Sequence, residues 1–258
     1  MNGEMKNRIG EFTRSLGVDD FGVAAIKDYK SPRSPAVESI FPEAKSMVVL
    51  AYKELASCDS ENNQIAMNGR LDLMEFSRSC NYQTARFIER DLKARCMAVP
   101  VSYPLPMTRE TLGAVADVST RHAAVAAGLG NFGRHNLVIH PEFGTRVIFT
   151  VVLTDLEVAP DTRVVERLCN DCGDCVESCP SGALDEEGKT DVLACLRSNQ
   201  PYGIGANIRF WSKFAESAVE DRQTMLADDK YWRLYQAGSI GFQYFCFNCM
   251  KVCPIGLE

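Results

Sequence analysis

Apolar residues in the first part of the chain follow two spacings, one helical and one typical of strands. Residues 4–16 carry apolar side chains three or four positions apart and stop before Gly17, which predicts an amphipathic helix. Residues 20–26 and 46–53 are short apolar runs, and both predict strands. The second run is apolar and branched enough for a strand that is buried on both faces.

The next stretch continues this mixture of elements. The polar segment 54–69 predicts a loop. Residues 70–97 form the longest helical pattern in the chain, with apolar side chains at steps of three and four. Residues 97–101 predict a short strand after that helix.

A short helix and a hairpin are expected further along. Ser119 or Thr120 can cap a helix that runs to Ala127 and ends at Gly128. Residues 136–158 consist of two apolar runs on either side of the turn sequence PEFG, which predicts a β-hairpin. The first part of the chain therefore predicts strands and helices built around one sheet.

The chain has 258 residues, which allows one large domain or two modest ones. A hydrophobic fraction of 46% is sufficient for a sizeable core. After Pro160 the composition becomes rich in cysteine, so we place a domain boundary there. We predict an α+β fold, with an α/β domain at 1–160 and a second domain at 161–258.

A dense cysteine run opens the second domain. Residues 169–180 read CNDCGDCVESCP, with four cysteines at spacings x2, x2 and x3 and a proline directly after the fourth. This is the run of bacterial ferredoxins that carry two 4Fe–4S clusters, in which the fourth cysteine binds the other cluster. The four cysteines are Cys169, Cys172, Cys175 and Cys179.

A second run lies near the end of the chain. Cys246, Cys249 and Cys253 precede Pro254, but the first cysteine of a full motif is missing, and Cys195 is the candidate to supply it. Because the fourth cysteine of each run crosses over, we expect two ligand sets. The first cysteine set is Cys169, Cys172, Cys175 and Cys253; the second cysteine set is Cys179, Cys195, Cys246 and Cys249.

Zinc and disulfides are the alternatives to clusters. Zinc sites use two separated pairs of ligands and need neither a third cysteine at the next x2 step nor the trailing Cys-Pro. Disulfides suit small secreted chains, whereas this chain is of medium size and shows no secretory signal. Of eleven cysteines, only Cys58, Cys80 and Cys96 lie outside the two sets, and we expect them to be buried free thiols.

Charge and hydropathy limit the partners. The net charge of −6 does not favour a nucleic-acid-binding face, since phosphate binding needs a basic surface. We therefore expect no nucleic-acid partner. The sequence offers no stretch long enough to span a membrane and no signal peptide at its start, so we expect a cytoplasmic protein without a membrane partner. A reducing cytoplasm also suits free thiols and oxygen-sensitive clusters.

Three glycines, Gly128, Gly130 and Gly133, spell the G-x-G-x-x-G of dinucleotide-binding proteins. That motif must follow a strand and open a helix, whereas here it follows a helix and leads into a strand, so a nucleotide site is rejected. Two interpretations remain: a tight turn between elements, or close approach of the backbone to a bulky group. The polar residues around the turn are Arg121, His122, Asn131, Arg134, His135 and Asn136.

Residues 121–158 together with the cysteine pattern resemble the epoxyqueuosine reductases and their short relatives, which are related to the cobalamin-dependent reductive dehalogenases. The resemblance covers about residues 5–258. Residues 74–83, MEFSRSCNYQ, are similar to the helix that carries arginine and tyrosine in that family.

The resemblance implies a nitroreductase-like α/β domain that binds cobalamin and a two-cluster, ferredoxin-like domain that delivers electrons to it. We expect the corrinoid to lie against the glycine turn, with the glycines touching the ring and the polar side chains bonding its amides. The cofactor-binding candidates are Gly128, Gly130, Asn131, Gly133, Arg134, His135 and Asn136.

Several positions depart from the family pattern. Members that modify tRNA continue into a helical-repeat domain, whereas this sequence stops at Glu258. The family's catalytic aspartate has no clean match, and Asp117 is the nearest candidate for the proton donor. Tyr82 and His122 are the other catalytic candidates.

These features predict an oxidoreductase that passes electrons from two 4Fe–4S clusters to cobalamin for the reduction of a small molecule. A low-potential ferredoxin or flavodoxin is the expected electron donor. Two alternatives stay open: an electron-transfer protein without cobalamin, and an accessory protein that reduces or carries a corrinoid.

Overall fold

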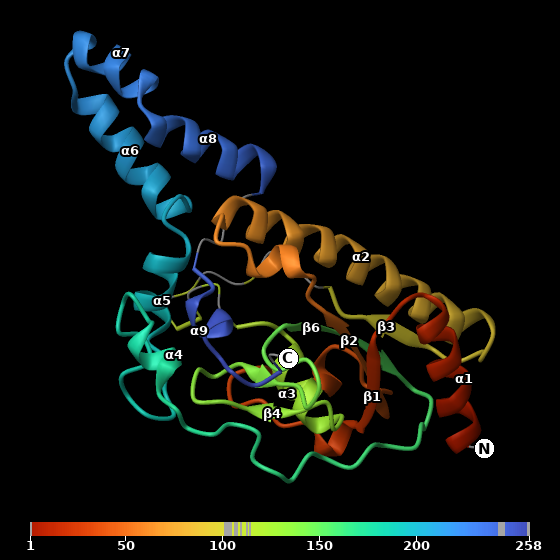
Figure 1. Ribbon diagram of the computed structural model, residues 1–258. Coiled ribbons are helices and arrows are strands. Elements are labelled where there is room, and N and C mark those ends of the chain that lie inside the picture. Colours follow the sequence, from red (N-terminus) through yellow and green to blue (C-terminus); the bar gives the residue numbers. More distant parts are fainter. Residues whose placement is uncertain are drawn as a thin grey trace.

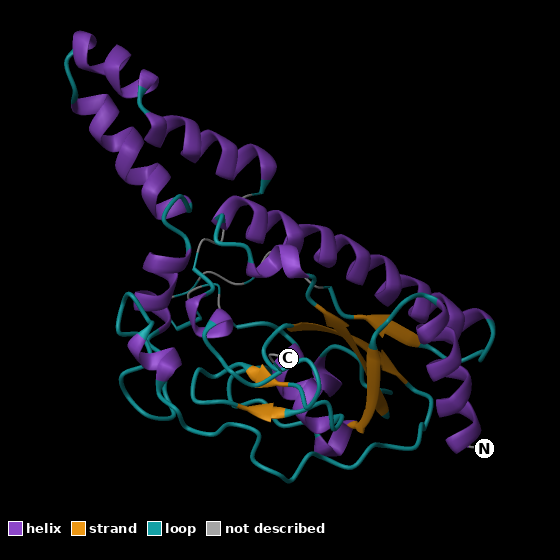
Figure 2. Ribbon diagram, in the orientation of Figure 1, coloured by secondary structure: helices purple, strands orange, loops and turns teal. Residues whose placement is uncertain are grey.

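The computed structural model describes residues 2–100, 105, 108, 110, 111, 113, 115–241 and 246–256 (Figure 1). A sheet with helices on both faces forms one part of the molecule, a cysteine-bearing region lies beside it, and a helical arm projects away from both (Figures 1 and 2). Among the described residues, no helix is both long and apolar enough to cross a bilayer.

The sheet has four antiparallel strands in the order β1-β2-β6-β3. Their bounds are Asp20–Ala25 for β1, Ser46–Lys53 for β2, Val147–Thr154 for β6 and Cys96–Ala98 for β3. The predicted strands at 20–26 and 46–53 are therefore confirmed, and β2 is buried along nearly its whole length because an apolar core covers each face of the sheet.

Alternate residues of the sheet enter two separate cores. Val48, Leu50 and Tyr52 of β2 pack with residues of the helices α1 (Asn2–Ser15) and α2 (Asn63–Arg90). The intervening residues Met47, Val49 and Ala51 pack on the other face with α3 (Thr120–Ala126). This alternation follows from the two-residue period of a strand, and it places α2 and α3 on opposite sides of the sheet.

The long helix α2 begins seven residues earlier than the expected start at residue 70. The side chain of Asn62 accepts hydrogen bonds from the backbone N–H groups of Gln64 and Ile65, which is the usual N-cap arrangement. Ala66 and Met67 in the added turns pack against Ala237 and Phe247, far along the chain. The expected loop at 54–69 is thus wrong in its second half, because the apolar partners of these residues are tertiary.

The hairpin expected at 136–158 is also wrong. The strand β5 (Val138–Ile139) pairs with β4 (Asn131–Phe132), while β6 pairs with β2 and β3 in the main sheet. A single bridge between His140 and Gly144 joins the two predicted arms. The glycine turn does lie after a helix and before strands, as predicted, since α3 precedes it and β4 begins within it.

The remaining helices belong to the cysteine region, the arm and the connections. The cysteine region contains α4 (Asp174–Glu177), α5 (Val192–Asn199) and α9 (Asn248–Lys251). The arm consists of α6 (Ile204–Glu216), α7 (Val219–Ala227) and α8 (Asp229–Ile240). Three short 3-10 helices span Ile26–Asp28, Val37–Ser39 and Ala56–Asp59.

The described aromatic residues of α8 lie away from the sheet, and part of them is exposed. Tyr231 stacks with Phe210 of α6, while Trp232 and Tyr235 of α8 are 50% and 56% exposed. They belong to the arm, which projects away from the region of α4, α5 and α9 (Figure 1). The aromatic residues within 242–245 lie outside the described residues, and Phe247 packs under α2.

Candidate iron–sulfur site

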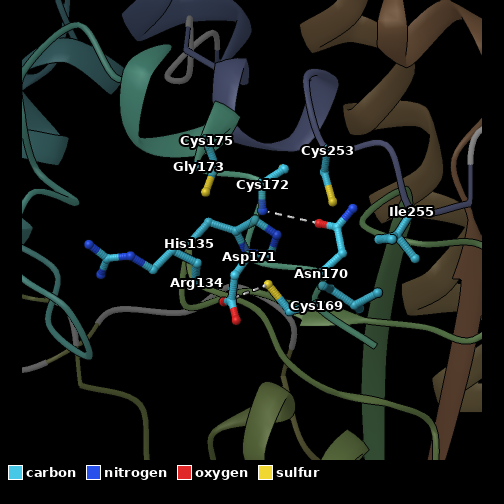
Figure 3. Close-up of a pocket in the computed structure, with 11 residues that line it drawn as sticks. Arg134, His135, Cys169, Asn170, Asp171, Cys172, Gly173, Cys175, Cys253 and Ile255 are labelled. Atoms are coloured by element: carbon cyan, nitrogen blue, oxygen red, sulfur yellow. Dashed lines mark hydrogen bonds between the residues drawn. The ribbon is translucent and has the colours of Figure 1, made fainter. Parts of the chain in front are cut away.

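A cavity in the cysteine region is lined by Cys169, Cys172, Cys175 and Cys253 (Figure 3). The cavity is partly open to solvent. The structure thus brings together the four members of the first cysteine set, although Cys253 comes from the far end of the sequence. A 4Fe–4S cluster takes four thiolates around it, so this donor set fits such a cluster.

The first run forms this cavity through its local geometry. Gly173 has a φ of +88° at the N-cap of α4, and Asp171 has a φ of +54°, so the chain curls tightly around Cys172. The side chain of Asn170 accepts a hydrogen bond from the backbone N–H of Cys172 at 3.3 Å. Cys175 then lies in the first turn of α4 and is buried.

Arg146, next to the start of β6, holds the second run in place. Its guanidinium donates hydrogen bonds to the carbonyl oxygens of Lys251 at 2.7 Å and Cys253 at 3.0 Å. It also contacts the carboxylate of Asp59 at 2.9 Å. The sequence analysis did not select this arginine. Its position directly before a buried strand was the available signal, because a charge near a core needs a partner.

Backbone packing strengthens the junction between residues 144–146 and the last cysteine run. A Cβ on Gly144 would overlap the carbonyl oxygen of Ile255, so the two segments meet without side chains between them. The Thr145 hydroxyl donates to the carbonyl of Met250 at 2.9 Å. The segment that ends in Cys253 is therefore fixed against the end of the sheet.

The second cysteine set lies around the pair of short helices α4 and α9. The Asn248 side chain of α9 donates to the carbonyl of Ser178 at 3.1 Å, which ties the two runs together. Burial raises the pKa of Cys249 to about 12, with a further contribution from the negative charge that Cys246 and Cys195 would carry. The pKa of Cys195 is likewise raised by burial and then by Cys246 and Cys179. The charge of Cys175 from the first set also contributes to the raised pKa of Cys249, so the two sets lie close together.

Cys179 differs from the others in its hydrogen bonding. Burial alone would raise its pKa, but donors at Ser181, Ala183 and Leu184 outweigh burial and lower the pKa of this thiol. Such donors favour the thiolate, which is the form that binds metals. In the described part of the chain, no three His, Cys, Asp or Glu side chains are close enough to chelate one ion, so the cysteines are spread around a space instead of meeting at a point.

Of the three other cysteines, Cys58 and Cys80 are buried as expected, whereas Cys96 is only partly buried. None of the eleven cysteines forms a disulfide in this structure, in which all eleven are described. Cys58 and Cys80 are buried, and the thiol of Cys96 is half-buried and contacts the carbonyl of Ala85. Burial raises the pKa of Cys80 to about 11 and that of Cys96 to about 12, so both stay protonated near neutral pH.

The glycine faces that were expected to touch a corrinoid ring are filled by protein. A Cβ on Gly128 would overlap the carbonyl oxygen of Thr162, and one on Gly130 would overlap that of Ile139. A Cβ on Gly133 would lie 2.7 Å from the His135 ring. Packing of protein atoms is therefore sufficient to explain glycine at these three positions. With a φ of +142° at Gly130, a Gly130→Val substitution would also disturb the fold itself.

The polar side chains of this turn contact the cysteine region. Asn131 donates to the carbonyl of Glu166, Asn136 to the hydroxyl of Thr190 at 3.3 Å, and Arg134 to the carbonyls of residues 185 and 186. The turn thus binds the segment 166–190 through these hydrogen bonds. Within the described residues, this arrangement does not fit the predicted corrinoid contacts.

The three catalytic candidates do not form one constellation. Asp117 is half-buried just before α3, and His122 lies in the first turn of that helix, with its Nδ1 2.8 Å from the Ser119 hydroxyl. Burial, and then the charge of Arg121, lower the pKa of His122. Tyr82 is 58% exposed on α2, across the sheet from α3, where it contacts Arg86.

Comparison with known proteins supplies the family context. A family model described as a 4Fe-4S binding domain matches residues 163–184, so the chain contains such a domain. Over 274 residues the chain is 21% identical to epoxyqueuosine reductase of Bacillus subtilis (strain 168), a match that covers 98% of this chain and 64% of that protein. Over 85 residues it is 41% identical to tetrachloroethene reductive dehalogenase of Desulfitobacterium hafniense, covering 31% of this chain and 15% of that protein.

The solved structures that resemble this fold come from the same two families. An epoxyqueuosine reductase in complex with a tRNA stem loop has a TM-score of 0.57 and 19% identity, covering 98% of this chain and 65% of the other. A reductive dehalogenase described in terms of B12-dependent dehalogenation has a TM-score of 0.62 and 18% identity, covering 97% and 38%. The resemblance to both families is confirmed. The chain spans less than two thirds of the length of these relatives.

Proposed function

We propose that this chain is an iron–sulfur oxidoreductase in which two 4Fe–4S clusters supply electrons for the reduction of a small molecule. The observation that carries the proposal is the cavity lined by Cys169, Cys172, Cys175 and Cys253. The reductases and dehalogenases among the relatives support the reaction class. Clusters of this kind transfer single electrons, so bond breaking needs a further acceptor.

Crossed ligation is part of the proposal. The first cysteine set would hold one cluster, and the second cysteine set the other. Support comes from the cavity, which is lined by all four members of the first set. We propose the corresponding division into a nitroreductase-like α/β part at 1–160 and a two-cluster, ferredoxin-like part at 161–258, in which the last run docks back onto the first part.

Cobalamin is the acceptor that the relatives favour, because one of the dehalogenase structures is described as B12-dependent. When bound, a corrinoid would supply a strongly reducing cobalt centre. The described residues of the turn 128–136 do not fit the predicted contacts, so no reaction step is derived through this group. Cobalt analysis and binding of added cobalamin, both under anaerobic conditions, decide whether it belongs to this protein.

The substrate requires protons as well as electrons. Reductive removal of an oxygen or a halide takes two electrons and at least one proton, and Asp117 and His122 at the start of α3 are the proposed donors. A ferredoxin or flavodoxin is the proposed source of electrons. One relative binds a tRNA stem loop, but for this chain we propose a small molecule, because the net charge of −6 does not favour a phosphate-binding surface.

A second candidate function is electron transfer without cobalamin. It is favoured by the packing of protein against all three glycine faces of the turn. Anaerobic purification followed by iron, sulfide and cobalt analysis separates the candidates. About eight irons per chain with bound corrinoid supports the reductase, whereas about eight irons without any affinity for corrinoid supports the electron-transfer protein. About four irons would contradict the two-cluster proposal itself, and retention of tRNA in a gel-shift assay would contradict the small-molecule substrate.

A further inference from the structure

A buried imidazole lies beside the cavity of the first cysteine set. His135 follows β4 in the glycine turn, is 5% exposed, and lines the same cavity as Cys169, Cys172, Cys175 and Cys253. Figure 3 shows its side chain among these cysteines. The sequence marked His135 as a contact for a corrinoid, whereas the structure places it at the cavity that these cysteines line.

Hydrogen bonding fixes which nitrogen of this ring carries the proton. The backbone N–H of Leu137 donates to Nδ1 of His135 at 3.0 Å. Nδ1 can accept that bond only when it is unprotonated, so the neutral ring carries its proton on Nε2. Nε2 is therefore a hydrogen-bond donor.

That donor has no partner in the described part of the chain. Four buried side-chain atoms there lack a hydrogen-bond partner, and His135 Nε2 is the one nitrogen among them. Leaving a buried N–H unpaired is costly, so an acceptor is expected next to it. The neighbouring space is the cavity between the cysteine side chains.

Gly133 and Ile139 determine where the ring lies. A Cβ on Gly133 would be 2.7 Å from Cε1 and 3.0 Å from Nε2 of His135, and 2.7 Å from the Ile139 side chain. Gly133 does not have a positive φ, so its backbone does not require glycine. The missing side chain instead leaves room for the imidazole, which a larger residue would displace.

We propose that His135 donates a hydrogen bond from Nε2 to a sulfur of the cluster held by the first cysteine set and thereby raises the reduction potential of that cluster. This inference rests on the proposed ligand set. Reduction adds one negative charge to a cluster, and a donor to a sulfur stabilises the more negative state more strongly. His135 is a positioning residue for electron flow and undergoes no chemistry itself.

The test is a potentiometric titration followed by electron paramagnetic resonance on anaerobically purified protein. His135→Phe removes the donor and keeps a planar ring. We expect about a tenfold decrease in the equilibrium constant for reducing one cluster, which corresponds to a midpoint potential lower by about 59 mV for one electron. The potential of the other cluster should not change. An unshifted potential with full iron content would overturn the proposal.

His140 provides a matched control. It is also buried, and its Nδ1 also accepts backbone N–H groups, but its Nε2 contacts Asp20 at 3.1 Å and it does not line the cavity. His140→Phe should leave both potentials unchanged at full iron content. A shift equal to that of His135→Phe would show that loss of any buried histidine has the same effect, and would overturn the specific role of His135.

A second measurement does not depend on cluster assembly in the variant. Protein labelled with 15N-histidine should show a nitrogen coupling to one reduced cluster, together with an exchangeable proton that disappears in D₂O. Absence of both couplings in a protein with full iron would overturn the proposal even where His135→Phe fails to assemble. Failure of the proposed ligand set is recognised separately, because Cys253→Ser would then keep its full iron content or lose the other cluster.

Discussion

The two cysteine sets are built from the same kind of residue but in different ways. The first takes three thiols from one short stretch, residues 169–175, and needs only Cys253 from elsewhere. The second takes Cys246 and Cys249 from the last run, while Cys179 follows α4 and Cys195 lies within α5. One site is therefore largely local, whereas the other depends on the tertiary placement of several elements.

Their polar surroundings also differ. The first set has the neutral imidazole of His135 at its cavity. The second set has backbone donors around Cys179, and the charge of Arg121 acts on Cys195. Because donors and charges near the sulfurs set the reduction potential, the two proposed clusters should be inequivalent. Such a difference in potential would favour electron transfer from the cluster of lower potential to the other.

The largest expected effect is the loss of one whole cluster in Cys253→Ser. We expect about four of eight irons to be lost or labile, with the signal of the first cluster changed and that of the second retained. Iron analysis and paramagnetic resonance of the reduced protein measure this. Damage confined to the cluster at Cys246 would mean that the two runs do not cross.

Cys195→Ala tests the second set in the same way, with the opposite cluster affected. The expected result is again about half of the iron, but with the first cluster and its potential intact. Cys96→Ala is the matched control, since this half-buried thiol belongs to neither set. Full iron and unchanged spectra in Cys195→Ala would exclude this residue as a ligand.

Arg146→Met tests the junction that brings Cys253 to the first set. It removes hydrogen bonds to two carbonyls of the last run and the contact with Asp59, so we expect a loss of about 2–3 kcal/mol in the free energy of unfolding. The clusters should assemble but be lost faster on dilution into chelator, as followed by absorbance. Arg167→Met removes an exposed ion pair with Asp171 and should cost less than about 1 kcal/mol. Equal loss rates in the two variants would argue against the junction.

The smallest effect is expected for Gly173→Ala. Gly173 has a φ of +88°, whereas Phe247 at the equivalent position before α9 has a φ of −129°. No protein atom lies within 4 Å of an added Cβ at Gly173, so the cost should be the backbone strain of about 1–2 kcal/mol. Thermal unfolding under anaerobic conditions measures it. Loss of half of the iron would show instead that the methyl group crowds the cluster.

The strands β1 and β2, the first helix and the cap of α3 were predictable because their signals are local. Apolar runs, a helical period and Ser119 as N-cap each lie within a few residues of the element that they specify. The cysteine runs were also recognisable, since three thiols at x2 spacing and a following proline form a pattern within one segment.

The predictions from sequence were wrong where the residues that pack or pair with an element are distant in the chain. The start of α2 depends on packing of Ala66 and Met67 against Phe247, and β6 pairs with β2 in place of the nearby β5. The glycines of the turn were interpreted as space for a ligand, but their neighbours are Thr162, Ile139 and His135.

The sequence by itself determined which residues can bind iron, because thiol chemistry and cysteine spacing are properties of single segments. The tertiary structure decided which thiols share a cavity, through Arg146 and the packing of Gly144 against Ile255. It also decided which way His135 faces, since the orientation of a buried ring depends on the backbone N–H of Leu137 and on the space left by Gly133. Contacts between segments far apart in the chain fix these features, and such contacts leave no periodic trace in the sequence.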